Sequence, residues 1–269
     1  MNIQIFRYNT ITSTNDEAVR QAELGAAEGV CVVASSQSQG KGREGRTWHS
    51  EEGGGLYFSI ILRPPIEEQF YPVMTLLGAV AVYDTVHTLT GAVPDIKWPN
   101  DVLVNEKKIS GILAERCESN IGPAIVLGIG INFVTDFLTE DVRANATSLS
   151  DISDEDLDFE VVLRTLTHCL SYKYERFKSL SNVNQVLGDW SVRSSYSRDK
   201  SVRVRTRTDE FTGTTMGLNP YGSLMVRRED GGLSTVTAGD VTAVRALEAE
   251  VEESPKDVND DELCENEID

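Results

Sequence analysis

Cysteine and histidine are scarce in this sequence, and neither residue type is arranged as a metal site requires. The 269 residues include only four cysteines and three histidines. The cysteines form no CxxC pair and lie far apart, at Cys31, Cys117, Cys169 and Cys264. A zinc site needs about four such ligands close together, so none is expected. We expect the thiols to be reduced and buried.

A long hydrophobic run is also lacking. No stretch of about 18 consecutive apolar residues occurs, which is the length that a membrane-spanning helix needs. The first seven residues, MNIQIFR, do not have the pattern of a signal peptide. We therefore expect a soluble protein of the cytoplasm without a membrane partner.

Positive charge is in short supply. The net charge is −18, and only eight of the 25 basic residues are lysines. Residues 247–269 hold eleven carboxylates and one lysine. We expect this acidic tail to be disordered, because like charges with few apolar partners cannot offset the entropy of ordering. Nucleic acid is not expected as a partner. The acidic, arginine-biased composition also suggests, as a hypothesis, a cell with concentrated internal salt, which would screen self-repulsion.

Hydrophobic periodicity predicts an α+β domain in the first part of the chain. Apolar residues recur at helical spacing over residues 71–90 and 159–177, and TNDE at 14–17 opens a further helical stretch through about Leu24. Strands are predicted by apolar runs at 30–34, 56–62, 95–104, 107–115 and 124–132, with Asn105 and Glu106 as a tight turn. We assign residues 1–190 to this domain.

From about residue 197 the pattern changes to short strands and glycine turns, which is typical of a small β-barrel. We assign residues 197–246 to this barrel and residues 247–269 to the tail. Arginines alternate with other residues in VRVRTR at 202–207. We interpret them as a solvated strand face rather than as a surface for a polyanion.

A loop rich in glycine and cations, GKGREGRTW, occupies residues 40–48. It matches the dinucleotide pattern G-x-G-x-x-G and nearly matches a P-loop. Both motifs need a helix directly after the glycines, because the helix N-terminus holds the phosphate. Here a strand follows instead, so we reject both. What is left is a loop whose Lys41, Arg43 and Arg46 can meet a phosphate or carboxylate, with Trp48 as a flat surface for a base.

KWPND at residues 97–101 adds weight to this loop. Together the two motifs resemble those of biotin protein ligases, whose loop reads roughly GRGRxGRxW. Three further matches follow the family's order: Ser13-Thr14-Asn15 with Gln37, KISGILAE at 108–115, and GIGIN at 128–132. The resemblance covers about residues 3–246. It implies a mixed β-sheet with flanking helices, similar to that of class II aminoacyl-tRNA synthetases, followed by a small SH3-like β-barrel.

Two positions depart from the family pattern. Lys41 stands where arginine is usual, which keeps the charge but loses bidentate geometry. Glu44 stands where many members carry arginine. The motifs begin at Ser13, so we expect no N-terminal DNA-binding domain and no operator binding.

The resemblance implies a ligase that works in two steps. The biotin carboxylate attacks the α-phosphate of ATP to give biotinyl-5′-AMP and pyrophosphate. A lysine amine of a biotin carboxyl carrier protein or domain then takes the biotin, and AMP leaves. The enzyme needs no nucleophile of its own, only positioning and stabilisation of charge. The sequence leaves open whether the enzyme is a monomer or a homodimer.

The residues implied to bind biotin form a polar group and a glycine group. Ser13, Thr14, Asn15 and Gln37 would hydrogen-bond the ureido ring, and glycines would leave room for the valeryl chain. The full implied set is Ser13, Thr14, Asn15, Gln37, Lys41, Gly42, Arg43, Lys108, Gly111, Gly128 and Gly130. The sequence TNDE at 14–17 is also explained by a helix-capping box, and both functions can coexist.

The residues implied to bind ATP are mostly cations and amides. The set is Arg43, Arg46, Trp48, Lys97, Asn100, Asp101 and Asn132. Arg43, Lys97 and Lys108 are the expected catalytic cations. Asp101 is the expected ligand of the Mg²⁺ that accompanies ATP, because this ion prefers oxygen donors. For Trp48, ordinary core packing is the alternative.

The sequence allows two alternatives to this function. A lipoate protein ligase shares the fold and the adenylation chemistry, but the polar groups at Ser13, Thr14 and Gln37 favour a ureido ring over a dithiolane. A non-catalytic binding module with a vestigial site is the other alternative. The joint presence of Arg43, Lys97, Asp101 and Lys108 argues against it.

Overall fold

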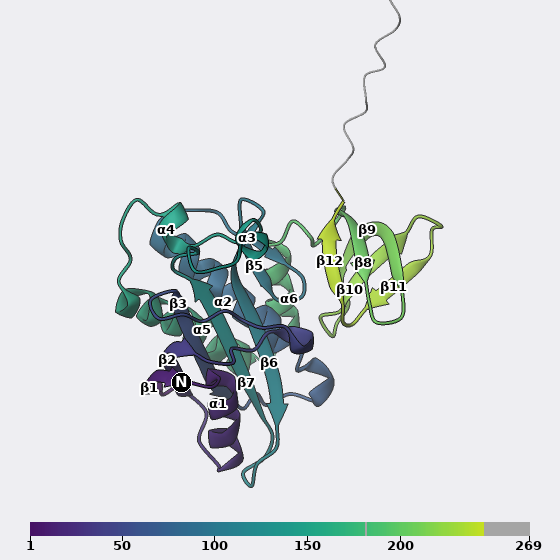
Figure 1. Ribbon diagram of the computed structural model, residues 1–269. Helices are drawn as coiled ribbons and strands as arrows, with labels where there is room; N and C mark the ends of the chain where they lie inside the picture. The colour runs from purple at the N-terminus through teal and green to yellow at the C-terminus, as the bar shows by residue number, and fades with distance from the viewer. Residues whose placement is uncertain (181, 245–269) are drawn as a thin grey trace, which may run out of the picture.

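The computed structural model describes residues 1–180 and 182–244. The acidic tail expected at residues 247–269 lies outside these residues. The described chain forms two β-sheets, a large one flanked by helices and a small one that follows it in sequence (Figure 1).

The large sheet has seven strands in the order β1-β2-β3-β7-β6-β5-β4. Strands β1 and β2 are parallel and all other neighbours are antiparallel, so the sheet is mixed. The strands are β1 Gln4–Ile11, β2 Val30–Gln37, β3 Gly55–Leu62, β4 Asp95–Lys97, β5 Asp101–Val104, β6 Lys107–Cys117 and β7 Ala124–Asn132.

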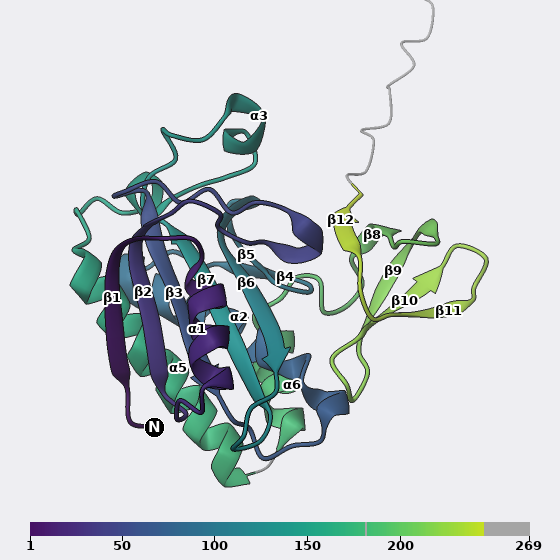
Figure 2. The ribbon, with the colours of Figure 1, turned by 60° about the horizontal axis from the view of Figure 1, so that its bottom comes forward.

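Helices cover both faces of this sheet, as Figure 2 shows: α1 lies on one face, and α2 and α5 lie on the other. All three predicted helices are present. The helices are α1 Thr14–Glu23, η1 Arg43–Gly45, η2 Glu68–Phe70, α2 Val73–Thr90, α3 Glu140–Arg143, α4 Leu149–Ile152, α5 Phe159–Leu180 and α6 Val183–Ser191. By length and composition alone, Glu68–Thr90 could cross a membrane, but 61% of that window is buried inside the protein, as expected of a core helix.

Residue alternation gives the sheet two different faces. Phe58, Ile112 and Ile129 belong to the core that packs against α2 and α5. On the opposite face, Tyr57 pairs with Gly130, and Gly130 with Gly111. The sequence GIGIN therefore places isoleucines in the core and glycines on the face that carries α1. This second face supplies the floor of the site described below.

The strand predicted at 95–104 is instead two strands, β4 and β5. Proline has no N–H to donate to a ladder, and the chain turns at Trp98-Pro99-Asn100, where the Trp98–Pro99 bond is cis. The predicted turn at Asn105 and Glu106 is confirmed. Both have positive φ, 50° and 63°, as a two-residue hairpin loop requires.

The small sheet is antiparallel, with strand order β11-β10-β9-β8-β12. Its strands are β8 Ser201–Arg205, β9 Glu210–Leu218, β10 Leu224–Arg228, β11 Leu233–Val236 and β12 Asp240–Ala243. Its buried valines are continuous with the core of the large domain. The indole Nε1 of Trp98 donates to the Gly222 carbonyl at 2.9 Å, which fixes KWPND against the small domain.

The N-terminus of α1 differs from the predicted capping box. The N-cap is Ser13, whose Oγ accepts from the Asp16 amide, and Thr14 is already helical. Thr14 does not cap because its hydroxyl donates to Gln37 instead. Glu17 accepts hydrogen bonds from Tyr8, Arg20 and Gln21.

Glu17 makes α1 sensitive to acid. Its pKa is lowered to about 2, chiefly by the hydrogen bond from Arg20. A carboxyl whose pKa is lowered by folding stabilises the protein above its unfolded pKa, and that contribution is lost as pH falls through the folded pKa. We expect Glu17→Gln to lower the melting temperature by about 2–4 °C at pH 7. The gap in melting temperature between the variant and the wild type should begin to narrow below about pH 4.5 and be nearly closed at about pH 2; a constant gap between pH 7 and pH 2 would contradict this.

Candidate active site

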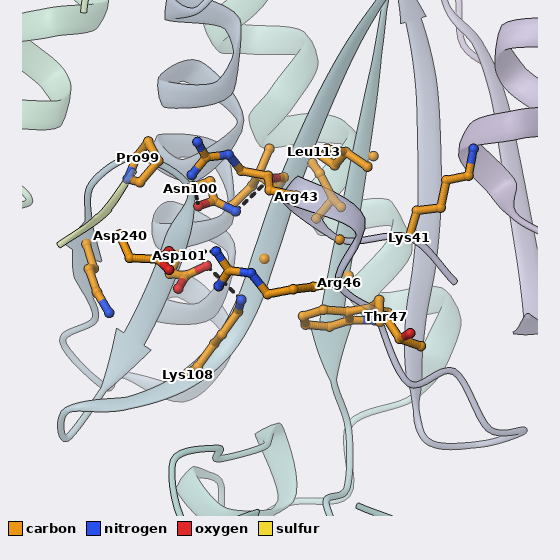
Figure 3. A pocket seen from close by; sticks show the side chains of 18 of the residues that line it. Lys41, Arg43, Arg46, Thr47, Pro99, Asn100, Asp101, Lys108, Leu113 and Asp240 are labelled. Carbon is orange, nitrogen blue, oxygen red and sulfur yellow. Dashed lines mark hydrogen bonds and ion pairs between the residues drawn. The ribbon is translucent and has the colours of Figure 1, made fainter. Parts of the chain in front are cut away.

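A cleft of about 690 Å³ lies between the α1-bearing face of the large sheet and the small domain (Figure 3). Its floor is made by β6 and β7, one wall by the N-terminus of α1, and the other by KWPND and the small domain. All of the residues predicted to bind biotin or ATP line this cleft, except Asn132.

The loop over residues 40–48 crosses the cleft as a short, hydrogen-bonded hairpin. The Gly42 amide donates to the Arg46 carbonyl at 2.7 Å, and the Trp48 amide donates to the Gly40 carbonyl at 2.9 Å. Glu44 occupies its tip in the left-handed region, with φ of 55°. This fold directs Arg43 toward Asn100, and Arg46 toward Asp101 and Asp240, as Figure 3 shows.

Lys41 is turned the other way (Figure 3). Its Nζ forms an ion pair with Asp16 in the first turn of α1, and this contact raises the pKa of Lys41. Lys41 thus borders the cleft but ties the loop to the helix that carries Thr14 and Asn15. Its predicted contact with biotin stays a prediction.

Arg43 is a half-buried cation without an ion-pair partner among the residues described. Its Nη1 donates to Asn100 Oδ1 at 3.2 Å, and the Asn100 amide donates in turn to the Ile112 carbonyl at 3.0 Å. Burial lowers the pKa of Arg43, although a guanidinium stays protonated in proteins. The result is an oriented, poorly solvated positive charge that an anion in the cleft would neutralise.

Lys108 and Asp101 face each other on adjacent strands. Lys108 Nζ lies 2.7 Å from Asp101 Oδ1, an ion pair whose angles are not those of a hydrogen bond. The same ammonium lies 5.4 Å from the centre of the Trp48 ring. Lys97 is the cross-strand neighbour of Asp101 and also lines the cleft, without an ion pair to any described residue. Two lysines therefore flank one carboxylate.

The polar wall of the cleft is held together by its own hydrogen bonds. Gln37 Oε1 accepts from the Thr14 amide at 2.7 Å and from the Thr14 hydroxyl at 3.1 Å. Gln37 Nε2 donates to the Ser50 hydroxyl at 2.8 Å. Ser13, Thr14 and Asn15 are all buried. These groups converge at the end of the cleft next to α1, as the polar set predicted for the ureido ring requires.

Three glycines of the floor make room for protein side chains. A Cβ at Gly130 would lie 2.3 Å from Trp48 Cε2, and one at Gly111 would lie 3.0 Å from Trp48 Cζ3. A Cβ at Gly128 would lie 2.0 Å from Asn15 Oδ1. The indole of Trp48 thus rests on the floor with its Nε1 buried and without a hydrogen-bond partner among the described residues. The role of these glycines toward the valeryl chain stays a prediction.

Gly130→Ala should displace the Trp48 indole, because the added Cβ would lie 2.3–2.5 Å from three atoms of that ring. We expect biotin-dependent pyrophosphate release to fall by about tenfold or more, the usual cost of overpacking. Gly188→Ala in α6 is the matched control, since a Cβ there meets nothing within 4 Å. Equal activities of the two variants would show that the position of the Trp48 indole on the glycine floor does not affect pyrophosphate release.

Asn132 lies outside the cleft lining. Its Nδ2 donates to the Thr147 carbonyl at 3.0 Å and to the Lys108 carbonyl at 3.3 Å. It therefore holds the strand that carries Lys108, and this geometry does not support the predicted contact with ATP. The motif GIGIN identified the residue but not the direction of its side chain.

The small domain contributes residues that the sequence did not identify as part of the site. Arg203 and Arg205 of β8, with Asp240 and Thr242 of β12, line the far wall of the cleft. Arg46 Nη2 donates to Asp240 Oδ1 at 2.6 Å, which joins the loop to this wall. The alternation of arginines correctly predicted an exposed strand face. It could not predict that this face borders the cleft.

Comparisons with known proteins agree with this geometry. Residues 6–132 match the biotin/lipoate A/B protein ligase family, and residues 199–242 match the biotin protein ligase C terminal domain. The second match lies within the predicted barrel. The expected combination of a mixed sheet with flanking helices and a small C-terminal β-domain is confirmed.

Individual relatives extend over most of the chain. It is 36% identical to the bifunctional ligase/repressor BirA of Bacillus spizizenii over 86% of this chain and 71% of that protein. It is 31% identical to the biotin–[acetyl-CoA-carboxylase] ligase of Mycobacterium tuberculosis over 87% of this chain and 86% of that one. The biotin protein ligase from Aquifex aeolicus in complex with biotin and ATP superposes with a TM-score of 0.77 at 29% identity, covering 90% and 99% of the two chains. The chain therefore belongs to the biotin protein ligase family.

Proposed function

We propose that this protein forms biotinyl-5′-AMP from biotin and ATP and then transfers the biotin to a lysine of a biotin carboxyl carrier protein or domain. The observation that carries the proposal is the convergence of Arg43, Lys97 and Lys108 in one cleft. They come from three separate segments of the chain, and they lie beside a polar wall that suits a ureido ring.

Adenylation requires two anions to touch, the biotin carboxylate and the α-phosphate of ATP. Arg43 and Lys108 would lower their mutual repulsion and stabilise the charge that develops as the carboxylate oxygen attacks phosphorus and pyrophosphate leaves. Arg43 is free of competing ion pairs with described residues, whereas Lys108 shares its charge with Asp101. This difference makes Arg43 the better candidate for the transferring phosphoryl group.

Arg46 suits the outer phosphates because its present partner is easily exchanged. Arg46 and Asp240 are each at least half exposed, and an exposed ion pair contributes less than about 1 kcal/mol. A phosphate can therefore replace Asp240 at little cost. Trp48 would offer its ring to the adenine.

In the second step the carrier amine attacks the carbonyl carbon of biotinyl-5′-AMP, and AMP leaves with its bonding electron pair. The same cations would stabilise the phosphate of the departing AMP. Asp101 is a carboxylate within the cleft that could accept the proton of the attacking amine, which would restore a neutral nucleophile.

Mg²⁺ fits this site as a companion of ATP rather than as a resident ion. No group of three or more histidine, cysteine, aspartate or glutamate side chains that could hold a metal occurs within residues 1–180 and 182–244. Asp101 Oδ1 already faces Lys108, and Asn100 Oδ1 already accepts from Arg43, so these two side chains do not form a metal site by themselves. Asp101 would hold a magnesium ion only together with the phosphates of ATP, whose charge the ion would neutralise.

The test is isotope exchange between ATP and labelled pyrophosphate, followed by transfer to a carrier domain. We expect exchange only when biotin is present, and acid-stable biotin on one lysine afterwards. Lipoic acid is the control substrate, and it should not replace biotin. Exchange supported by lipoic acid and not by biotin would overturn the proposal in favour of a lipoate ligase.

The cytoplasm is the proposed location, supported by the free thiols of the three described cysteines.

A further inference from the structure

Two polar side chains of the large sheet, Ser59 and Glu115, reach the polar wall from outside the cleft lining. Ser59 is fully buried in the middle of β3, among apolar neighbours. Its Oγ lies 2.6 Å from Asn15 Oδ1 and 2.8 Å from Thr14 Oγ1. Glu115 of β6 accepts a hydrogen bond from Asn15 Nδ2 at 2.7 Å. Both atoms of the Asn15 amide are therefore held by the sheet.

The neighbouring strand closes the third side of this amide. Ser59 pairs with Gly128 across β3 and β7, and any Cβ at Gly128 would collide with Asn15 Oδ1. The amide thus rests on Gly128 between Ser59 and Glu115. A carboxylate can only accept, so the atom that faces Glu115 must be the nitrogen of Asn15, which excludes the flipped orientation.

We infer that Ser59 and Glu115 are positioning residues that set the specificity of the cleft for a ureido head group. The inference rests on the proposed function, because it assumes that the polar wall binds this ring. A cyclic urea has one carbonyl and two N–H groups in a fixed plane. Asn15 can match them only if its amide keeps one orientation, and Thr14 only if its hydroxyl stays in place.

Burial makes the arrangement selective. A hydroxyl buried in a strand is costly unless it is hydrogen-bonded, so Ser59 is poorly explained by packing alone. A site built to hydrogen-bond a polar group also rejects molecules that lack that group, because its own buried groups would lose their partners. Ser59 and Glu115 would therefore favour a cyclic urea over a dithiolane without touching either.

The test compares ligand affinities of the full-length protein by isothermal titration. We expect Ser59→Ala and Glu115→Ala to weaken biotin binding by about tenfold, the usual effect of a lost hydrogen bond in a buried site. Desthiobiotin keeps the ureido ring, so its affinity should fall by the same factor. The affinity for ATP and the rate of pyrophosphate release at saturating biotin should change less than about twofold.

A rescue and a control separate positioning from general stability. Glu115→Gln can still accept through its Oε1, so it should bind biotin more tightly than Glu115→Ala. Thr85→Ala removes another fully buried hydroxyl, which donates to the Ala81 carbonyl within α2. We expect this control to melt earlier but to bind biotin as the wild type does.

The outcomes distinguish a failure of the proposed function from a failure of the positioning role of Ser59 and Glu115. A wild-type protein that does not bind biotin would refute the proposed function itself. If the wild type binds biotin and both alanine variants bind it equally well, the positioning role is refuted. Equal losses of biotin and ATP affinity would refute it too, since they would indicate a general disturbance. Should Ser59→Ala fail to fold, the comparison of Glu115→Ala with Glu115→Gln decides.

Discussion

Arg43→Ala is expected to lower biotin-dependent pyrophosphate release by about 100-fold or more, without a lower melting temperature. The size of the loss is that of removing one preorganised donor from a developing negative charge. Stability should be unchanged or higher, because burial makes the Arg43 charge costly and no described carboxylate forms an ion pair with it, although Glu44, Asp101 and Asp240 attract it from farther away. Stopped-flow or isotope-exchange measurements and a melting curve of the same preparation provide both numbers.

Arg7→Ala is the matched control for this prediction. Arg7 is also an arginine, but it lies on β1 and forms an exposed ion pair with Glu160. Its loss should affect neither activity nor stability measurably. Arg43→Lys should fall between wild type and Arg43→Ala, since it keeps the charge but not the planar fork. An Arg43→Ala enzyme with near-normal pyrophosphate release would refute the assignment of Arg43.

Lys108→Met is expected to impair both chemical steps and, unlike Arg43→Ala, to destabilise the fold. We expect a loss of about 100-fold or more in pyrophosphate release. The methionine would leave Asp101 Oδ1 without its ion-pair partner in a largely enclosed position, which is costly. Single-turnover assays of adenylation, and of transfer from added biotinyl-5′-AMP, measure the two steps separately.

A double variant separates the two effects of Lys108. Lys108→Met combined with Asp101→Asn removes both charges, so stability should recover while activity stays low. Lys107→Met is the control, because Lys107 is the exposed neighbour on the same strand. Transfer at the wild-type rate in Lys108→Met would show that this lysine acts in the first step only.

The motifs and the alternation of residues predicted much of the site. GIGIN alternates glycine with isoleucine, so Gly128 and Gly130 had to share a face. KISGILAE lacks this alternation, because Lys108 and Gly111 are three residues apart, and both line the cleft across a register shift between β5 and β6. The loop was correctly separated from dinucleotide and P-loop motifs, because a strand rather than a helix follows it. Local patterns of this kind depend only on neighbouring residues, which is why they could be recognised.

The features of the site that the sequence did not predict depend on contacts between distant segments. Arg203 and Arg205 were identified as an exposed face, but tertiary contacts such as the hydrogen bond from Trp98 to Gly222 turn that face toward the cleft. Thr14 was expected to cap α1, yet Gln37 lies close enough to take its hydroxyl, and Ser13 caps instead. Ser59 gave no signal at all, since a lone serine in a strand looks like an interruption of the core.

The central claim is that cations from separate segments meet where the biotin carboxylate and the α-phosphate must touch. A crystal structure with a non-hydrolysable analogue of biotinyl-5′-AMP tests it most directly. We predict that the Arg43 guanidinium and the Lys108 ammonium lie within about 3.2 Å of the phosphate-equivalent oxygens, with the ureido ring beside Asn15. An analogue seated elsewhere, or in this cleft with both cations directed away from its phosphate mimic, would contradict the account.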